Sequence, residues 1–305
     1  MRVLILAFSP AGSTMKVSRI LEKKLTEKGH SVQLCDVTRN KEIFKNNDPS
    51  AFFSDVVKEH DVICIGSPVY EKHLEYYVRR LMEQLPEPDG KKWGKYAVSF
   101  VTFGGISSGI ALQQSVSVFK KSGRTTIACM KLEASHIVTK KLKTRVNENM
   151  PGDEALPYIQ DLAEKIDSLK NADGKAAAVQ KSELKSHGLR EKILCTIMDE
   201  RKLHRHTYPQ FKIVEDKCSK CLACVNACSI QRIENRNGAP FMNGTQPECI
   251  HCFSCVNACP RDAVTFVGDE AGWNKIERIF SKVAKEGSFF RSTESPKSQV
   301  YPLHK

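Results

Sequence analysis

The sequence lacks the long apolar runs and the nucleotide-binding turns that mark several common protein classes. No run approaches the about 18 apolar residues of a membrane span, and the run at residues 3–8 is too short for the apolar part of a secretory signal. That run is followed by neither a G-x-G-x-x-G turn nor the Gly-Lys-[Ser/Thr] of a Walker A loop. We therefore expect no membrane span and no Rossmann-type NAD(P)H site.

The sequence also lacks a concentrated basic surface. Its formal net charge is +12, but the basic residues are scattered along the chain. Nucleic-acid binding favours a clustered basic stripe with aromatic platforms, so we expect no nucleic-acid partner. No paired catalytic carboxylates and no Ser-His-Asp arrangement can be assigned, and no catalytic residue is predicted.

Cysteine is abundant, and most of it lies in one repeated motif. The copies begin at Cys218 and Cys249, thirty-one residues apart, and read CSKCLACVNACS and CIHCFSCVNACP. Seven of the twelve aligned positions are identical, including every cysteine. Each copy has the spacing C-x2-C-x2-C-x3-C, which places three thiolates around one point and directs the fourth elsewhere.

This is the bacterial ferredoxin spacing, in which the fourth cysteine of each run ligates the other cluster. It predicts two [4Fe–4S] clusters. The first cysteine group is then Cys218, Cys221, Cys224 and Cys259. The second cysteine group is Cys249, Cys252, Cys255 and Cys228.

Zinc is the alternative metal, because it also binds thiolates. Zinc sites usually use two separated C-x2-C pairs, whereas each run here carries a third and a fourth cysteine. The doubled spacing favours iron–sulfur clusters. One position departs from the pattern: Ser229 stands where the second copy has Pro260. A serine restores an N–H donor beside the cluster, which leaves the two reduction potentials open.

The other four cysteines are expected to be buried free thiols. Cys35, Cys64 and Cys129 lie in apolar, β-branched runs, and Cys195 lies in a predicted helix. There is no disulfide framework. Free thiolates for clusters favour a reducing compartment, so we predict a cytoplasmic protein.

Residues 1–170 alternate between strand and helix patterns. Strands are predicted at residues 3–8, 31–37, 61–69, 96–103 and 125–132, and helices at 14–28, 73–85, 109–121 and 151–169. The pattern indicates a parallel sheet with helices on both faces. Five strands suit the flavodoxin-like order 2-1-3-4-5, a doubly wound α/β fold.

Ligands of this fold lie beyond the carboxyl ends of the strands. Three loops at that edge are rich in small, hydroxyl or aromatic residues, and together they favour a flavin site. Their predicted cofactor-binding residues are Ser9, Ala11, Gly12, Ser13, Thr14, Ser67, Pro68, Val69, Tyr70, Thr102, Phe103, Gly104 and Gly105. Taken singly, the first loop is equally a helix-capping turn, Tyr70 a packing residue and the two glycines a turn.

The segment after residue 171 combines a predicted linker with helix and short-strand patterns. Residues 172–184 have the composition of a flexible linker, and residues 188–203 predict a helix whose apolar stripe docks on a neighbouring domain. His204 and His206 are expected to be solvated, and His251 lies near a cluster without being a ligand. Short strands are predicted at residues 211–214 and 264–267, a helix at 271–285 and a poorly ordered tail from residue 287.

Two resemblances cover most of the chain. Residues 1–170 look like flavodoxin, whose phosphate loop has a Ser/Thr-x-Thr-Gly-x-Thr pattern; Ser9, Gly12 and Thr14 match it, and Ala11 replaces a hydroxyl residue. Residues 211–268 resemble bacterial two-cluster ferredoxins. We predict four parts: 1–170, the flavin-binding region; 171–210, a linker with an amphipathic helix; 211–268, the ferredoxin region; and 269–305, a C-terminal helix and tail.

The whole chain is similar to the flavodoxin–ferredoxin fusion proteins of anaerobic microbes. That resemblance implies FMN, two [4Fe–4S] clusters and electron transfer with redox partner proteins. FMN takes one or two electrons and a cluster takes one, so the pair joins one-electron to two-electron chemistry. The alternative is an enzyme, an iron–sulfur flavoprotein reductase of a small molecule that is fed by its own clusters.

Overall fold

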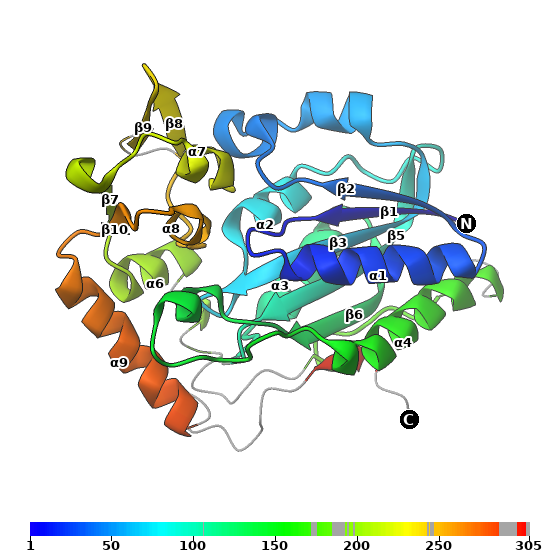
Figure 1. Ribbon diagram of the computed structural model, residues 1–305. Helices are drawn as coiled ribbons and strands as arrows, with labels where there is room; N and C mark the ends of the chain where they lie inside the picture. Colours follow the sequence, from blue (N-terminus) through cyan, green and yellow to red (C-terminus); the bar gives the residue numbers. More distant parts are fainter. Residues whose placement is uncertain are drawn as a thin grey trace.

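The computed structural model describes residues 1–105, 107–171, 176–184, 193, 195–197, 199–242, 244, 247–286 and 298–302. A twisted sheet with helices on both faces occupies the first half of the chain, and a smaller cysteine-rich region packs against one edge of it (Figure 1).

The strand order confirms the expected α/β fold. The strands of the main sheet are β1 (Arg2–Ala7), β2 (Ser31–Asp36), β3 (His60–Tyr70), β5 (Trp93–Phe103), β6 (Thr125–Glu133) and β11 (Gln299–Tyr301), and the short β4 (His73–Leu74) pairs with β3. The order is β11-β6-β5-β3-β1-β2, and the pairs among β1, β2, β3, β5 and β6 are parallel. These five strands have the flavodoxin-like order that the sequence predicts.

Helices cover both faces of the sheet, as the unbroken apolar strands require. They are α1 (Ser13–Glu27), α2 (Tyr76–Glu83), α3 (Ala111–Lys121) and α4 (Leu156–Asp167). Leu21 of α1 and Ile159 of α4 share one core with Ile5 of β1. Leu81 of α2 and Phe119 of α3 lie in the core on the other face. Both faces of the sheet are therefore buried.

At the edge of the sheet beside β6, two segments differ from their predicted structure. β11 pairs antiparallel with β6, and Tyr301 is 1% exposed, so this part of the predicted tail belongs to the core. Val179 and Leu184 are buried, and the Val179 amide donates to the Thr126 carbonyl oxygen at 2.8 Å. Residues 176–184 therefore pack on the α/β region instead of forming a flexible linker. Residues 172–175, 287–297 and 303–305 lie outside the described residues.

The cysteine-rich region is built from two similar halves. Its elements are α6 (Glu200–Thr207), β7 (Phe211–Ile213), α7 (Ala223–Ala227), β8 (Ile233–Arg236), β9 (Ala239–Met242), α8 (Ser254–Ala258), β10 (Val264–Phe266) and α9 (Glu270–Glu286). β7 pairs antiparallel with β10, which confirms the two predicted short strands, and β8 pairs with β9.

The two cysteine loops repeat the same unusual backbone. Lys220 and Leu222 in the first loop have φ of 57° and 60°, and their counterparts His251 and Phe253 have φ of 47° and 58°. Left-handed backbone costs a residue other than glycine about 1–2 kcal/mol. Both loops therefore hold a strained conformation that wraps the chain around the thiols.

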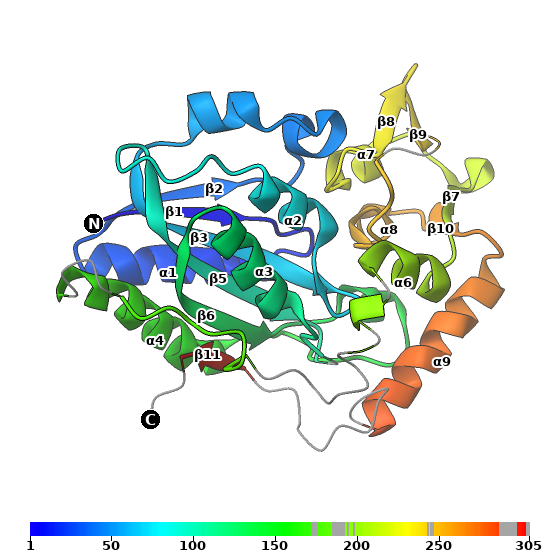
Figure 2. The same ribbon diagram turned by 180° about the vertical axis from the view of Figure 1, so that it is seen from behind.

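The cysteine-rich region lies at the carboxyl ends of the parallel strands (Figures 1 and 2). Ser254 Oγ donates to the Pro10 carbonyl oxygen at 2.8 Å, and the Arg39 amide donates to the Ser229 carbonyl oxygen at 2.8 Å. Thr144 Oγ1 donates to Glu277 of α9 at 2.7 Å. One apolar core runs from the sheet into this region. Within the described residues, no helix combines the length and the apolar composition needed to cross a membrane.

Candidate cofactor sites

The four members of the first cysteine group meet at one place. Cys218, Cys221, Cys224 and Cys259 line a single small cavity between the β7–β10 pair and α7. Cys259 comes from the second motif, so the chain crosses over as the spacing suggests. Cys221 is exposed, which places this group near the surface.

The second cysteine group lies deeper. Cys228, Cys252 and Cys255 are buried, and Cys249 is half-buried. Burial raises the pKa of the Cys255 thiol well above its usual range, and repulsion from the thiolates of Cys252, Cys249 and Cys228 raises it further. Burial likewise raises the pKa of Cys249 to about 12. Four thiolates are stable at such a site only beside compensating positive charge, which iron supplies.

Backbone amides point at the sulfurs of both groups. Arg232 N donates to Cys228 Sγ at 3.1 Å and Ala263 N donates to Cys259 Sγ at 3.2 Å. The hydroxyl of Ser229 lies 3.6 Å from Cys252 Sγ. The Ser229 hydroxyl can hydrogen-bond this sulfur, whereas Pro260, at the matching position of the second motif, has no such group.

No three His, Cys, Asp or Glu side chains of the described residues converge as the ligands of a single metal ion do. Four sulfurs around one zinc ion lie about 3.8 Å apart, given Zn–S bonds of about 2.3 Å.

A cavity of about 310 Å³ opens at the carboxyl ends of β1, β3, β5 and β6; we call it the edge cavity. This lies at the lower end of the range for ligand sites. Ten of the thirteen residues predicted to bind flavin line it, and they come from all three predicted loops: Ser9, Ala11, Ser13, Thr14, Pro68, Val69, Tyr70, Thr102, Phe103 and Gly104.

Hydrogen bonds hold the first and third loops together. Thr14 Oγ1 lies 2.8 Å from Thr102 Oγ1, and Ser9 Oγ accepts from the Met15 amide at 2.9 Å. Gly12 has φ of 87° and caps α1 without a side-chain hydrogen bond, and no acidic residue lies in the first turn. The positive end of α1 is therefore uncompensated by an acidic side chain and suits an anion.

Three predicted residues lie outside the edge cavity. Gly12 lines a neighbouring cavity instead. Ser67 is fully buried, and its hydroxyl donates to the Pro68 carbonyl oxygen at 2.8 Å. Gly105 has φ of 76°, and a Cβ there would lie 2.4 Å from the Asn147 amide nitrogen. Ser67 and Gly105 therefore affect the conformation of the loops without lining the edge cavity.

The cysteine-rich region forms the far wall of the edge cavity. His251 and Phe253, both between cysteines of the second group, line it together with His204 and Tyr208. His204 is 4% exposed, so the expectation of a solvated histidine is wrong. Its ring packs among aromatic neighbours, 5.6 Å between centroids from His251. The side chain of His206 lies outside the described residues.

Several wall residues had no counterpart in the predicted site. Residues 134–137 follow β6 at the same sheet edge, and strand order alone would have pointed to them. Ile279 and Phe280 of α9 belong to the apolar stripe of a predicted helix, but nothing in that stripe names its partner. The predicted docking stripe of residues 188–203 is largely outside the described residues; of its members, Ile193 and Ile197 are exposed.

A second cavity of about 300 Å³ adjoins the first on the outer side of the phosphate-type loop; we call it the basic cavity. The two cavities share Ala11 and Ser13 among their lining residues. Lys16, Lys140 and Arg145 line the basic cavity, and Lys16 Nζ donates to the Pro151 carbonyl oxygen at 2.6 Å.

Two family models match this chain. Residues 1–136 match the family described as NADPH-dependent FMN reductase, and residues 217–264 match the 4Fe-4S dicluster domain. A search of curated proteins gave no match.

Solved structures with a similar fold include flavodoxins. An archaeal flavodoxin is 15% identical over 56% of this chain and 99% of its own, with a TM-score of 0.37. Oxidised flavodoxin 1 of Bacillus cereus is 14% identical over 54% and 96%, with a TM-score of 0.38. An NADH:FMN oxidoreductase in its apo form is 14% identical over 54% and 88%, with a TM-score of 0.42.

The family models agree with the strand order and with the repeated cysteine motif. The chain joins a flavodoxin-like α/β region to a 4Fe–4S ferredoxin-type region. The two matches support a flavin and iron–sulfur redox protein.

Proposed function

We propose that this protein transfers electrons between two [4Fe–4S] clusters and FMN, and so couples one-electron to two-electron redox partners. The observation that carries this proposal is the composition of the edge cavity. Ser9 and Tyr70 of the flavin-type loops and Phe253 of the second cysteine loop line the same cavity. Two cofactors held by these residues would be close neighbours, as direct electron transfer requires.

The first and second cysteine groups would each hold one cluster. A cluster supplies one-electron chemistry, and the protein supplies the thiolates, the amide hydrogen bonds and the burial that set its potential. Because Cys221 is exposed and the second group is buried, the first group offers the face that a redox partner protein would approach.

The loops of the edge cavity would hold FMN. The amides at the start of α1 and the hydroxyls of Ser9 and Ser13 suit its phosphate, and Tyr70 and Phe103 provide aromatic surface for its ring system. Bound FMN supplies both one- and two-electron chemistry. We include a reducing, cytoplasmic compartment in this proposal, because the cluster ligands must remain free thiols.

Cofactor analysis gives the first test. Protein purified without oxygen should contain about eight iron and eight sulfide per chain together with FMN. Zinc without sulfide would refute the cluster assignment.

Kinetics test the transfer itself. After rapid reduction of the clusters, flavin absorbance should change at a rate that is independent of protein concentration. A rate that rises linearly with concentration would mean that electrons pass between molecules, and the proposed intramolecular route would be lost.

The basic cavity favours a second candidate, a reductase of an anionic small molecule. Three cationic side chains line this cavity directly beside the edge cavity, so a negatively charged substrate would be attracted there. The family name of residues 1–136 is that of a reductase, which agrees with this candidate. A carrier oxidises and reduces stoichiometrically, whereas a reductase consumes substrate over many turnovers with a suitable reductant.

A further inference from the structure

We infer that His204 and Glu200 form a proton relay between solvent and the edge cavity. This inference rests on the proposed function, because a flavin that accepts two electrons must also accept protons. The relay is carried by one geometric fact: His204 lines the edge cavity on one side and a small surface crevice on the other.

The side crevice leads from the surface to the buried pair. Tyr76, Arg201, Glu200 and His204 are among its lining residues. Arg201 is half-exposed, with 42% of its side chain accessible, whereas Glu200 and His204 are 5% and 4% exposed. Glu200 and His204 line the crevice, and His204 also lines the edge cavity, so the pair lies between the two.

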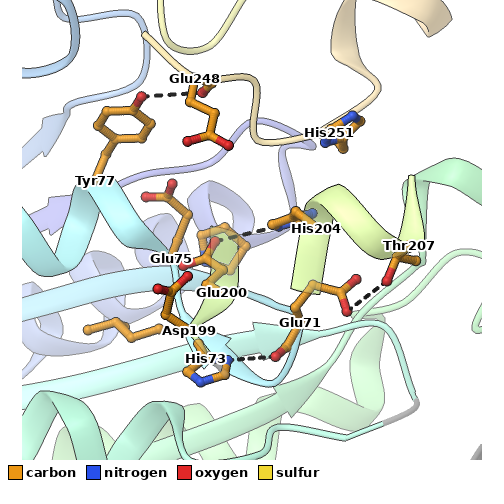
Figure 3. A network of polar contacts seen from close by, with 12 residues as sticks. Glu71, His73, Glu75, Tyr77, Asp199, Glu200, His204, Thr207, Glu248 and His251 are labelled. Carbon is orange, nitrogen blue, oxygen red and sulfur yellow. Dashed lines mark hydrogen bonds and ion pairs between the residues drawn. The ribbon is translucent and has the colours of Figure 1, made fainter. Parts of the chain in front are cut away.

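The geometry of Glu200 and His204 differs from that of an ion pair that only stabilises the fold. His204 Nε2 lies 3.6 Å from Glu200 Oε1, which is an ion-pair distance but too long for a hydrogen bond. Both ring nitrogens of His204 and Glu200 Oε1 are buried without a hydrogen-bond partner. Figure 3 shows Nε2 turned to Glu200 and the other ring nitrogen turned away. Unpaired buried polar atoms are costly, so their retention points to a role outside packing.

The charges around the pair set its resting state. Burial is the largest cause of both shifts: it raises the pKa of Glu200 well above its usual range and lowers that of His204 well below. The carboxyl of Glu75 adds to the first shift, and the rings of His251 and His73 add to the second. Burial therefore favours a protonated carboxyl and a neutral imidazole in this pair.

The other titratable or charged groups around the pair come from every element packed against it. They are Tyr70 and Glu71 from β3 and the turn after it, Tyr76, Tyr77 and Arg79 of α2, Arg201 and Tyr208 at the ends of α6, and Glu248 and Cys249 at the start of the second cysteine loop. Arg79 and a backbone hydrogen bond from Tyr76 oppose a protonated Glu200 by lowering its pKa. The Arg201 guanidinium stacks 4.3 Å from the Tyr76 ring.

Protons and charge balance across the pair. His204 gives the proton of Nδ1 to the ligand in the edge cavity and takes one at Nε2 from the Glu200 carboxyl. Glu200 then takes a proton from water in the side crevice. One proton enters the cavity for each proton that leaves solvent, and the electrons arrive from the clusters. The imidazole ends neutral with its proton on Nε2, so the ring must turn over before it passes a second proton.

Three variants separate the relay from packing. Glu200→Gln keeps the volume and removes the acidic proton, Glu200→Asp keeps the acid, and His60→Gln is the matched control. His60 is another buried histidine with an unpaired Nε2, but it lies at the amino end of β3, away from the cavity.

Proton uptake after rapid reduction of the loaded protein is followed with a pH-indicator dye, alongside flavin absorbance. We expect Glu200→Gln to slow uptake about 100-fold, Glu200→Asp to restore part of the rate, and His60→Gln to match the wild type. Equal uptake rates in Glu200→Gln and wild type would overturn the relay and leave the proposed function standing. Wild-type protein whose flavin is never reduced by the clusters would refute the proposed function instead.

Infrared spectra of flavin-free protein provide a readout that needs no turnover. A protonated carboxyl band should persist at neutral pH in the wild type, shift in D₂O and lose intensity in Glu200→Gln. If that variant does not fold, Glu200→Asp supplies the comparison, because Glu75 also holds a proton near neutral pH. A band of the same position and intensity in Glu200→Asp and the wild type would overturn the relay, since the band would then belong to another carboxyl.

Discussion

Glu75 should destabilise the folded protein at neutral pH, although it caps a helix. Its Oε2 accepts the Val78 amide at 2.8 Å at the start of α2, its other oxygen has no hydrogen-bond partner, and the residue is fully buried. Burial, the largest cause, raises the pKa of Glu75 from 4.5 to about 7. The folded protein therefore holds this proton over a range where the unfolded chain has lost it.

Linkage between proton binding and folding gives the sign and size of the effect of Glu75 on the free energy of unfolding. A raised pKa gives a contribution that is fully present below about pH 4.5 and is lost as pH rises toward 7. Between about pH 5 and pH 8 the loss is about 2–3 kcal/mol, from a difference of about 2.5 pH units. Glu75→Gln retains an oxygen for the cap and does not titrate, so it should be more stable than wild type by about this amount at pH 8.

Anaerobic urea unfolding, followed by tryptophan fluorescence, measures the difference. Wild type and Glu75→Gln are compared at about pH 5 and pH 8, because cluster loss is common to both and cancels in the comparison. Their free energies of unfolding should be nearly equal at about pH 5, and at about pH 8 that of Glu75→Gln should be the larger. An identical pH dependence would show that Glu75 is ionised in the folded state, and the reasoning from burial would fail.

Three shorter predictions concern the ligands, the phosphate-type loop and the added strand. Cys259→Ser should damage the electron paramagnetic resonance signal of the first cysteine group; damage confined to the second would refute the crossed arrangement. Gly12→Val should weaken FMN binding about tenfold or more, measured by fluorescence titration, whereas Gly29→Val, with a similar positive φ of 78° and equally open space, should not. Tyr301→Ala should lower the free energy of unfolding by about 3–5 kcal/mol, against less than about 0.5 for the exposed Val267→Ala; equal costs would contradict a structural role for β11.

The α/β fold was predictable because its signals are local. Residues such as Ile5 and Ile63 belong to unbroken apolar strands, and each strand is separated from the next by a helix pattern, so the parallel order follows from general rules. β11 escaped prediction because three residues carry little pattern. Its pairing depends on the open edge of β6, which no local signal in residues 299–301 describes.

The candidate site was only partly predictable, for a related reason. Ser9, Tyr70 and Thr102 follow strands, so the rule for parallel sheets places them at one edge. His204 follows no strand, and its polar side chain in a charged segment reads as solvated. It is buried because Tyr208 packs beside it and the second cysteine loop stacks His251 on it, and the His251 contact joins segments more than forty residues apart.

The burial of His204 also explains why the two regions of this chain are joined so closely. A loose tether would co-localise two carriers and leave the edge cavity open to water on its outer side. Here the second cysteine loop, α6 and α9 together line that side. Ser254 fastens the second cysteine loop to the phosphate-type loop, and the Arg39 amide fastens the segment after β2 to Ser229 of the first cysteine motif. Excluding water strengthens every electrostatic interaction in the cavity, but it also removes the ordinary source of protons. Along the side that these elements line, the proposed proton-coupled chemistry needs a proton route, and the buried carboxyl and imidazole between the cavity and the crevice meet that need.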